Sequence, residues 1–448
     1  MSWLDDRGGG RAETRQDAAE SARYHATSLI FVNASQVVTC EGPARGRRGV
    51  EMKDAAIRAG VSVVTSGETI AAVGPEQELR AAFPDAEVVD CRRGVLTPGL
   101  VDSHTHALFG RPRYEEQELR AAGVDYMEIA RRGGGIHASV RDLRARDEQA
   151  LATLAISRLR RLASYGVTTV EVKSGYGLTL DDELKSLRAI ARAAAELPMR
   201  VIPTFLGAHE IPLEHRDSEA ARAEYVAIVV REMIPTVTRE RLARFADVFC
   251  ETGVYTVDES RRILRAARDY GLLLKLHADE LTSSGGAELA AELRATSADH
   301  LAAISERGIA ALAGSSTVAT LLPGTMLFLG KTARAPARRL LDAGVPVALA
   351  TDFNPGTSPT PNFPLILSLG VSQLGLSAAE ALVAGTVNGA AALDLADRTG
   401  QLVPGFSADL ALFEIEDARE LPYWYGDRRC LGTWVRGKTC QPLHLPVC

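Results

Sequence analysis

The middle of the chain repeats one pattern: a short apolar, β-like run ends in polar residues and is followed by an Ala/Leu/Arg-rich helical stretch. Eight such runs can be placed, at 100–101, 167–172, 201–205, 245–249, 272–276, 297–300, 317–322 and 345–349. Between them, helical periodicity is clearest at 182–196, 257–270 and 335–343. Strands that alternate with helices pair in parallel, so this order predicts the α/β class and a (β/α)8 TIM-type barrel.

Both ends of the chain have a different pattern, with short β-rich runs separated by turn residues. The runs lie at 28–33, 61–65, 69–73, 409–413 and 432–437. Because chain termini often lie close together, we expect residues 27–98 and 397–448 to form one small β-sandwich domain beside a barrel of residues 99–396. Residues 1–26 are polar and glycine-rich and lack the apolar stretch of a signal peptide, so we expect a disordered tail there.

Charge and composition exclude several classes of function. The net charge is −6 and no Lys/Arg block stands out, which argues against a nucleic-acid partner. No apolar run approaches about eighteen residues, so no membrane span is expected. The 6 cysteines are scattered without a CxxC pair and fit reduced thiols in the cytoplasm.

Unusual polar residues cluster where predicted strands end, which is where barrel enzymes carry their catalytic groups. Five of the 9 histidines fall at such ends: His104, His106, His209, His277 and His300. Asp352 follows the last run. Side chains two residues apart on an extended segment point to the same side, so His104 and His106 can converge on one ion. Three histidines and an aspartate suit Zn²⁺ or Fe²⁺ with one position open for water.

Longer segments around these residues resemble the amidohydrolase superfamily and, more closely, the imidazolonepropionase family, which opens a ring in histidine degradation. The resemblance covers nearly everything from about Ser28 onward. The segments that carry it are 96–106, 104–110, 132–136, 171–178, 204–209, 247–251, 275–280, 297–300 and 350–357. Of these, Lys173-Ser-Gly-Tyr-Gly-Leu178 and Thr351-Asp-Phe-Asn-Pro-Gly-Thr357 are the most specific.

The resemblance implies a set of site residues. The implied metal ligands are His104, His106, His277 and Asp352, holding one Zn²⁺ or Fe²⁺/Fe³⁺ per chain. The implied catalytic residues are Glu280, His300 and Asp352, and which of them handles each proton stays open. The implied substrate contacts are Arg113, Tyr126, Tyr176, His209, Glu280, Asn354, Gly356 and Thr357. The chain departs from the family at Gly110-Arg-Pro-Arg113, where Arg111 competes with Arg113 for a substrate carboxylate; spacing favours Arg113.

The implied reaction is the opening of 4-imidazolone-5-propionate to N-formimidoyl-L-glutamate by a metal-bound water, the third step of histidine degradation. The partners expected are this small carboxylate-bearing substrate and a second copy of the chain in a homodimer, with no nucleic acid and no membrane. One metal is favoured over two, because the fourth predicted strand ends in Phe249-Cys-Glu251 without a bridging lysine and Lys173 follows the second strand.

Two other functions compete. A nucleobase-type deaminase of the same superfamily would share the histidines, Asp352 and Glu280, but its substrate has no carboxylate for Arg113 to bind. A non-catalytic scaffold with this fold would have lost ligands, whereas all four implied ligands are present.

Overall fold

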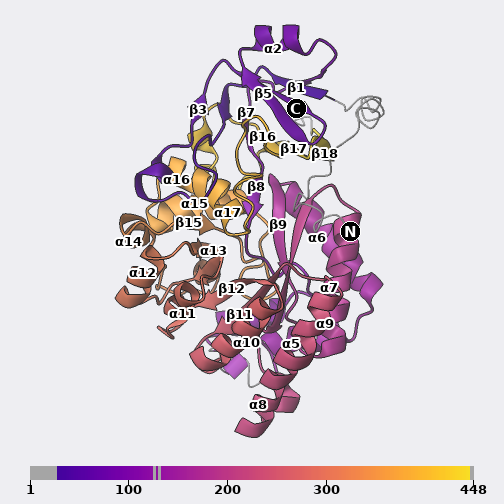
Figure 1. Cartoon of the computed structure of the whole chain (residues 1–448), viewed down its shortest axis with the longest axis vertical. Coiled ribbons are helices and arrows are strands. Elements are labelled where there is room, and N and C mark those ends of the chain that lie inside the picture. Colours follow the sequence, from indigo (N-terminus) through magenta and orange to yellow (C-terminus); the bar gives the residue numbers. More distant parts are fainter. Residues whose placement is uncertain (1–27, 125–127, 130–132, 444–448) are drawn as a thin grey trace.

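Eight parallel strands form the centre of the molecule, and each is hydrogen-bonded to the next strand along the sequence (Figure 1). The computed structural model describes residues 28–124, 128–129 and 133–443. The barrel strands are β8 (Leu100–Asp102), β9 (Val167–Lys173), β10 (Arg200–Ala208), β11 (Phe245–Cys250), β12 (Leu273–Ala278), β13 (Ser297–His300), β14 (Val318–Leu321) and β15 (Val347–Leu349). Closure comes from the segments that follow the first and last strands, where Thr105 and Phe353 form a parallel bridge.

Helices return the chain between successive strands and cover the outside of the barrel (Figure 1). Their starts follow from capping residues: the Thr179 side chain accepts from Asp182 N, and Thr256 forms a capping box with Glu259. The helices are α3 (Tyr114–Ala121), α5 (Ile136–Arg144), α6 (Glu148–Ala163), α7 (Leu180–Ala195), α8 (Glu219–Ile228), α9 (Ile234–Arg239), α10 (Val257–Asp269), α11 (Gly286–Glu292), α12 (Glu306–Ala313), α13 (Pro323–Phe328), α14 (Ala337–Asp342), α15 (Phe363–Leu374), α16 (Ala378–Ala384) and α17 (Val387–Ala391). Short turns are η2 (Leu213–His215) and the π-helical η3 (Val229–Met233).

Two smaller sheets bring the chain ends together. One has the order β5-β4-β1-β6 and the other β18-β17-β16-β7-β2-β3, so the second mixes strands from both ends. Their strands are β1 (Ser28–Val32), β2 (Gln36–Val38), β3 (Ile57–Arg58), β4 (Ser62–Ser66), β5 (Thr69–Gly74), β6 (Glu87–Asp90), β7 (Val95–Pro98), β16 (Leu410–Phe413), β17 (Cys430–Val435) and β18 (Lys438–Gln441), with η1 (Gly49–Lys53), α2 (Glu76–Ala82) and η4 (Ala418–Glu420) between them. Phe31 and Trp434 meet edge to face at 4.8 Å in the core that these sheets share.

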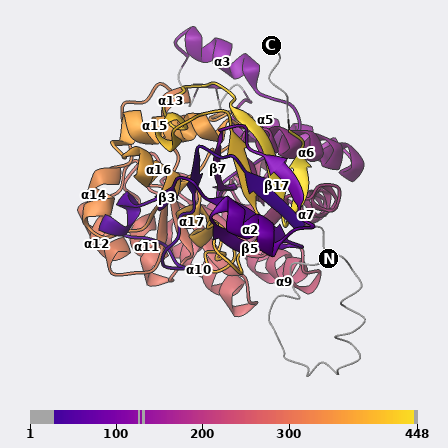
Figure 2. The same ribbon diagram turned by 90° about the horizontal axis from the view of Figure 1, so that it is seen from above.

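The end sheets sit against one end of the barrel, as the indigo and yellow segments show in Figures 1 and 2. Phe413 of β16 lies against Gly166, just before β9, where an added Cβ would come 2.6 Å from the Phe413 ring. This contact is at the amino end of β9. The carboxyl ends of the barrel strands, where the polar residues gather, are therefore on the other side.

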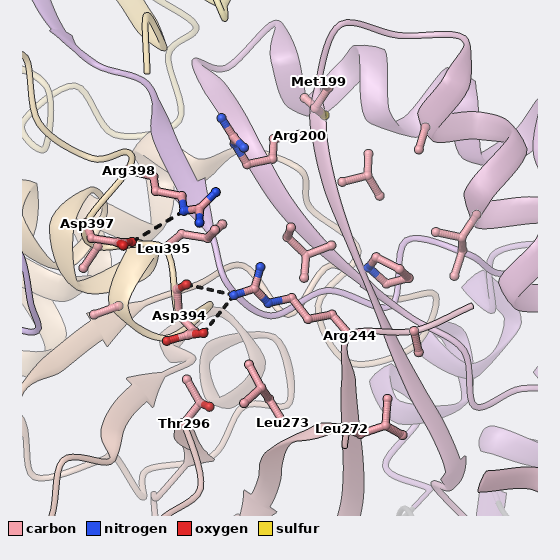
Figure 3. Close-up of a pocket in the computed structure, with 18 of the residues that line it drawn as sticks. Met199, Arg200, Arg244, Leu272, Leu273, Thr296, Asp394, Leu395, Asp397 and Arg398 are labelled. Atoms are coloured by element: carbon pink, nitrogen blue, oxygen red, sulfur yellow. Dashed lines mark hydrogen bonds and ion pairs between the residues drawn. The ribbon is translucent and has the colours of Figure 1, made fainter. Parts of the chain in front are cut away.

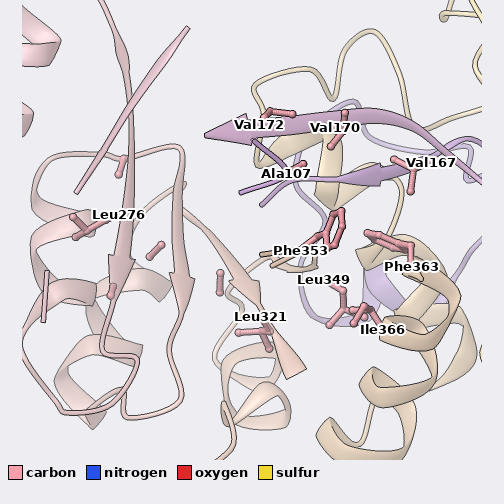
Figure 4. Packing of buried hydrophobic residues seen from close by; sticks show 14 of the residues in the cluster. Ala107, Val167, Val170, Val172, Leu276, Leu321, Leu349, Phe353, Phe363 and Ile366 are labelled. Atoms are coloured by element: carbon pink, nitrogen blue, oxygen red, sulfur yellow. The ribbon is translucent and has the colours of Figure 1, made fainter. Parts of the chain in front are cut away.

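The barrel separates two kinds of side chain. Val170 and Val172 of β9 and Leu276 of β12 pack among apolar residues (Figure 4). Their neighbours Glu171 and Lys275 are also fully buried but contact one another inside the barrel. Successive side chains of a strand point to opposite faces of the barrel. The apolar side chains therefore pack against the surrounding helices, and the polar side chains fill the inside.

The predicted (β/α)8 barrel is confirmed, and all eight predicted strands occur in the predicted order. The errors are at the boundaries. β10 continues to Ala208 because an irregularity carries its pairing with β11 past Phe205. Leu272 stays outside β12, and Lys173 is the last residue of β9 instead of following it. The predicted tail at residues 1–26 and Tyr126 lie outside the described residues.

Candidate metal centre and substrate pocket

Histidine rings converge at the carboxyl ends of the barrel strands. His104 and His106 follow β8, His277 lies in β12 and His300 ends β13. The His104 ring lies 5.3 Å from that of His106 and 4.5 Å from that of His277, centroid to centroid. Asp352 follows β15 in the chain, and its backbone N–H donates to His104 O at 3.0 Å. The barrel thus assembles residues that are up to 248 positions apart (Asp352 and His104).

The ring nitrogens face one another as ligands of a cation would. His277 Nε2 lies 3.3 Å from His106 Nε2, and Asp352 Oδ1 lies 3.6 Å from Nε2 of both His104 and His106. His104 Nε2 is buried and has no hydrogen-bond partner among the described residues. A buried nitrogen lone pair without a partner is costly, and a metal ion at this point would satisfy it together with its neighbours. The donor set therefore fits a metal ion held by His104, His106, His277 and Asp352.

Carboxylates behind the rings fix two of these histidines. His104 Nδ1 lies 2.6 Å from Asp299 Oδ2, and His277 Nδ1 lies 2.9 Å from Asp247 Oδ2. A carboxylate accepts the proton on Nδ1 and so leaves the Nε2 lone pair free for a metal.

Burial sets the protonation of the site. It lowers the pKa of His104, His106 and His300 well below the usual value, so these rings are neutral and able to bind a metal. Burial also raises the pKa of Asp352 to about 6, although the Thr325 hydroxyl donates to its Oδ2 at 2.5 Å and favours the ionised form. At neutral pH Asp352 is then a carboxylate with an unusually high proton affinity.

Glu280 and His300 form a second pair on the rim. Their closest atoms, Glu280 Oε2 and His300 Nε2, lie 3.5 Å apart. Burial and the nearby charge of Asp352 raise the pKa of Glu280 well above its usual range. A cavity of about 240 Å³ adjoins His300 between β13 and α13. The pair can exchange a proton with a molecule bound beside Asp352.

Arg113, and not Arg111, points into the protein. The Arg113 side chain is only 6% exposed and lies 3.3 Å from Glu116 Oε1, whereas Arg111 is 58% exposed and pairs with Glu115 on the surface. An added Cβ on Gly356 would come within 1.4 Å of Arg113 Nη2, so this glycine makes room for the guanidinium. Arg113 also lowers the pKa of His209, after burial and His277, which places its charge beside the histidine cluster.

Tyr176 and His209 form an aromatic wall next to the ligand set. The His209 ring stacks on that of His106 at 4.9 Å and 18°, and Tyr176 lies 5.2 Å from His209. His209 Nδ1 is 2.9 Å from Gly175 O, in the glycine-rich turn after β9. Both rings are buried. They give the site a flat, largely apolar side suited to a planar ring.

The loop after Asp352 is held by its own asparagine. Asn354 Nδ2 donates to Asp352 O at 2.7 Å, and Asn354 Oδ1 accepts from the backbone of Gly356 and Thr357 at 2.8 and 2.7 Å. The side chain of Asn354 is therefore engaged within the loop, which it shapes beside Arg113. Gly356 and Thr357 lie on the same loop, and Tyr126 is outside the described residues.

Asp247 and Asp299 were not among the predicted site residues, although a sequence signal for them exists. Both stand in short apolar strands at positions that alternate with outward-facing residues, as Glu171 and Lys275 do. Charged residues with a period of two in otherwise apolar strands indicate a polar barrel interior.

A large cavity, of about 1290 Å³, lies at the opposite end of the barrel, among the amino ends of its strands. There Arg244 pairs with Asp394 at 2.8 Å and Arg398 lies 3.9 Å from Asp397 (Figure 3). Its described lining contains no histidine. Size alone does not mark the active end of a barrel, and the convergent side chains are all at the other end.

His209 gives a pH-dependent stability that can be measured. Burial lowers its pKa to about 3. On acidification His209 therefore becomes protonated in the unfolded chain while it stays neutral in the folded chain. Stability is therefore lost as the pH falls below about 6.5, by about 2 kcal/mol between pH 7 and pH 5. In His209→Gln this contribution is absent. Guanidinium denaturation of the metal-free proteins should show that the difference in free energy of unfolding between wild type and variant changes by that amount between pH 7 and pH 5. Free energies of unfolding that change equally with pH in the two proteins would contradict this assignment.

Comparison with known proteins agrees with this geometry. The amidohydrolase family matches residues 126–441, and the imidazolonepropionase-like composite domain of bacteria matches residues 63–86. The imidazolonepropionase of Geobacillus kaustophilus is 46% identical over 89% of this chain and 94% of its own length. That of Symbiobacterium thermophilum is 47% identical over 89% and 93%.

Solved structures show the same fold at low identity. Guanine deaminase from E. coli has a TM-score of 0.72 at 17% identity, covering 93% of this chain and 100% of its own. An adenosine deaminase from Xanthomonas campestris with bound zinc has a TM-score of 0.69 at 19% identity, covering 94% and 95%.

Proposed function

Because the chain belongs to the imidazolonepropionase family of the amidohydrolases, we propose that it opens the ring of 4-imidazolone-5-propionate to give N-formimidoyl-L-glutamate, the third step of histidine degradation. It is a hydrolase that acts on a cyclic amide bond. The observation that carries the proposal is the convergence of His104, His106, His277 and Asp352 beside the buried Arg113.

The metal centre is proposed to hold one Zn²⁺ or Fe²⁺/Fe³⁺ ion per chain. When bound, the ion supplies Lewis acidity, which lowers the pKa of water towards neutrality and polarises a carbonyl oxygen. A single ion is supported by the surroundings of Lys173, the nearest candidate for a bridging group. Its Nζ lies 2.7 Å from both Glu171 Oε2 and Asp247 Oδ2 and is therefore occupied by ion pairs.

The proton steps fall to three side chains that meet at the pocket. Asp352 accepts a proton from the attacking water, because its carboxylate has a raised pKa and stands at the ligand cluster. The hydroxyl adds to the ring carbonyl carbon and the ring C–N bond breaks. Glu280, whose pKa is raised, is suited to bind or protonate the ring nitrogen. His300, neutral and 3.5 Å from Glu280, is placed to hold the carbonyl oxygen or the water.

Arg113 is proposed to bind the propionate carboxylate. A planar guanidinium can hold a carboxylate through two parallel hydrogen bonds, and burial strengthens them by excluding water. Tyr176 and His209 would flank the planar ring, with Asn354, Gly356 and Thr357 shaping the loop beside it. Tyr126 stays a prediction.

Loss of the ultraviolet absorbance of 4-imidazolone-5-propionate tests this function, with ammonia release from guanine, adenine and cytosine measured on the same preparation. We expect ring opening and no deamination. Ammonia from a nucleobase without ring opening would replace the proposal with a deaminase, a reaction that uses the same ligand set but gives Arg113 no carboxylate to bind.

Several further expectations belong to this proposal. The domain bounds at residues 98 and 396, the homodimer and the cytoplasmic location are proposals, and light scattering of the purified protein tests the dimer. The five described cysteines are free, four of them buried, as a reducing compartment would allow. None of the helices in the described part of the chain combines the length and the apolar composition of a membrane span.

A further inference from the structure

A layer of five buried charges fills the barrel directly beneath the histidines. Its members are Glu171, Lys173, Asp247, Lys275 and Asp299, none more than 1% exposed. They come from the inner faces of β9, β11, β12 and β13. Charged side chains are almost never fully buried unless they are paired. The groups with which these five side chains pair therefore indicate what the layer does.

Each ammonium group in the layer pairs with at least two carboxylates. Lys173 Nζ lies 2.7 Å from Glu171 Oε2 and 2.7 Å from Asp247 Oδ2. Lys275 Nζ lies 3.2 Å from Glu171 Oε2 and 3.5 Å from Asp299 Oδ2, and donates to Ser103 O at 2.5 Å. Glu171 thus links the two lysines, and Thr204 fixes it by donating to its Oε1 at 2.6 Å.

The outer carboxylates of the layer are the partners of the histidines. Asp247 Oδ2 lies 2.9 Å from His277 Nδ1, and its Oδ1 accepts from His277 N at 3.2 Å. Asp299 Oδ2 lies 2.6 Å from His104 Nδ1. His106 differs, because among the described residues no carboxylate pairs with its Nδ1, and its one carboxylate contact, with Asp352, is through Nε2. Two of the three histidines therefore depend on the charge layer for their orientation and tautomer.

The formal charges of the layer complement a divalent ion. Three carboxylates against two ammonium groups leave one negative charge, and Asp352 adds a second. A matching cation stabilises a buried cluster with two excess negative charges, and a divalent metal ion supplies that charge. Loss of Lys173 would leave the buried Asp247 without its lysine partner, and loss of Lys275 would leave Asp299 with only Lys173, whose Nζ lies 4.0 Å away.

We propose that Lys173 and Lys275 are positioning residues of the metal centre: they hold Asp247 and Asp299 as oriented carboxylates, which in turn present Nε2 of His277 and His104 to the metal. This inference rests on the proposed metal-dependent function. It assigns the two lysines a role in metal affinity that does not require contact with the metal or the substrate.

The test is the Zn²⁺ affinity of chelator-stripped protein, measured by competition with a chromophoric chelator, for Lys173→Met and Lys275→Met. Methionine keeps the length of the side chain and removes its charge. Lys185→Met is the matched control, because Lys185 lies in α7 and pairs there with Asp182 at 2.6 Å. We expect affinity to fall about 10- to 100-fold in the two barrel variants and to stay unchanged in the control.

Guanidinium denaturation of the stripped proteins separates positioning from a purely structural role. A lower unfolding midpoint with Zn²⁺ affinity within twofold of wild type would overturn the proposal. Should Lys173→Met fail to fold, the double variant Glu171→Gln/Lys173→Met removes one charge of each sign, and the same loss of affinity is expected of it. Wild-type protein that binds no metal would instead refute the proposed function.

Discussion

Replacing Asp352 by asparagine is expected to lower kcat for ring opening by at least about 10³-fold. Asparagine has nearly the same shape but carries no charge and cannot take a proton from water. Both tasks, binding the metal and accepting the proton, are proposed for Asp352, because its Oδ1 lies 3.6 Å from Nε2 of His104 and His106 while burial raises its pKa to about 6. Steady-state kinetics and metal content should be measured on one preparation, so that loss of chemistry is distinguished from loss of metal.

Thr325→Val is a milder variant that tests the same carboxylate. It removes only the hydroxyl that donates to Asp352 Oδ2 at 2.5 Å, so the carboxylate remains. We expect a loss of about 10-fold or less. An Asp352→Asn protein that keeps its metal and more than a tenth of wild-type kcat would show that another group accepts the proton, with Glu280 the first candidate.

Replacing Arg113 by methionine is expected to lower kcat/KM by about 10²-fold, mainly through KM, because methionine cannot form the two charge-assisted hydrogen bonds proposed between Arg113 and the substrate carboxylate. Arg113 is buried against Glu116 and Gly356 beside the histidines. Methionine fills a similar volume, and metal content should not change.

Arg111→Met is the matched control, two residues away on the same segment. Its guanidinium is exposed and pairs with Glu115 at 3.0 Å, so kinetic constants within twofold of wild type are expected. An equal loss in both variants, or a loss in Arg111→Met alone, would reassign the carboxylate contact. This pair of variants therefore decides the question that the Gly110-Arg-Pro-Arg113 sequence leaves open.

The barrel and its active end could be predicted from the sequence because both follow from local patterns. Apolar runs and capped helices alternate along the chain, and a residue just past a strand has its position fixed by the fold, as with His104 and His300. The choice between Arg111 and Arg113 stays a prediction. Spacing favours Arg113, and the structure adds what spacing alone does not reveal, that the Arg113 side chain is the buried one.

The charge layer could not be predicted in the same way. The sequence presents Lys173 only as a poorly placed bridging group. Nothing in β9 itself shows that its ammonium group, beside Glu171 of the same strand, also pairs with Asp247 of β11, two strands away. The same holds for Asn354. The family resemblance implies that it lies in the pocket, but its hydrogen bonds to Asp352 O and Thr357 N depend on the backbone conformation of the loop after Asp352. Both features arise from contacts between segments distant in sequence or from loop geometry.

The single-metal centre is tested by a titration of chelator-stripped protein with Zn²⁺ and, anaerobically, with Fe²⁺, while ring opening of 4-imidazolone-5-propionate is followed. We expect no activity in the stripped protein and a linear return of activity that saturates at about one equivalent per chain for at least one of the two metals. Full activity in the stripped protein, or saturation only at two equivalents, would contradict a single metal ion held by His104, His106, His277 and Asp352.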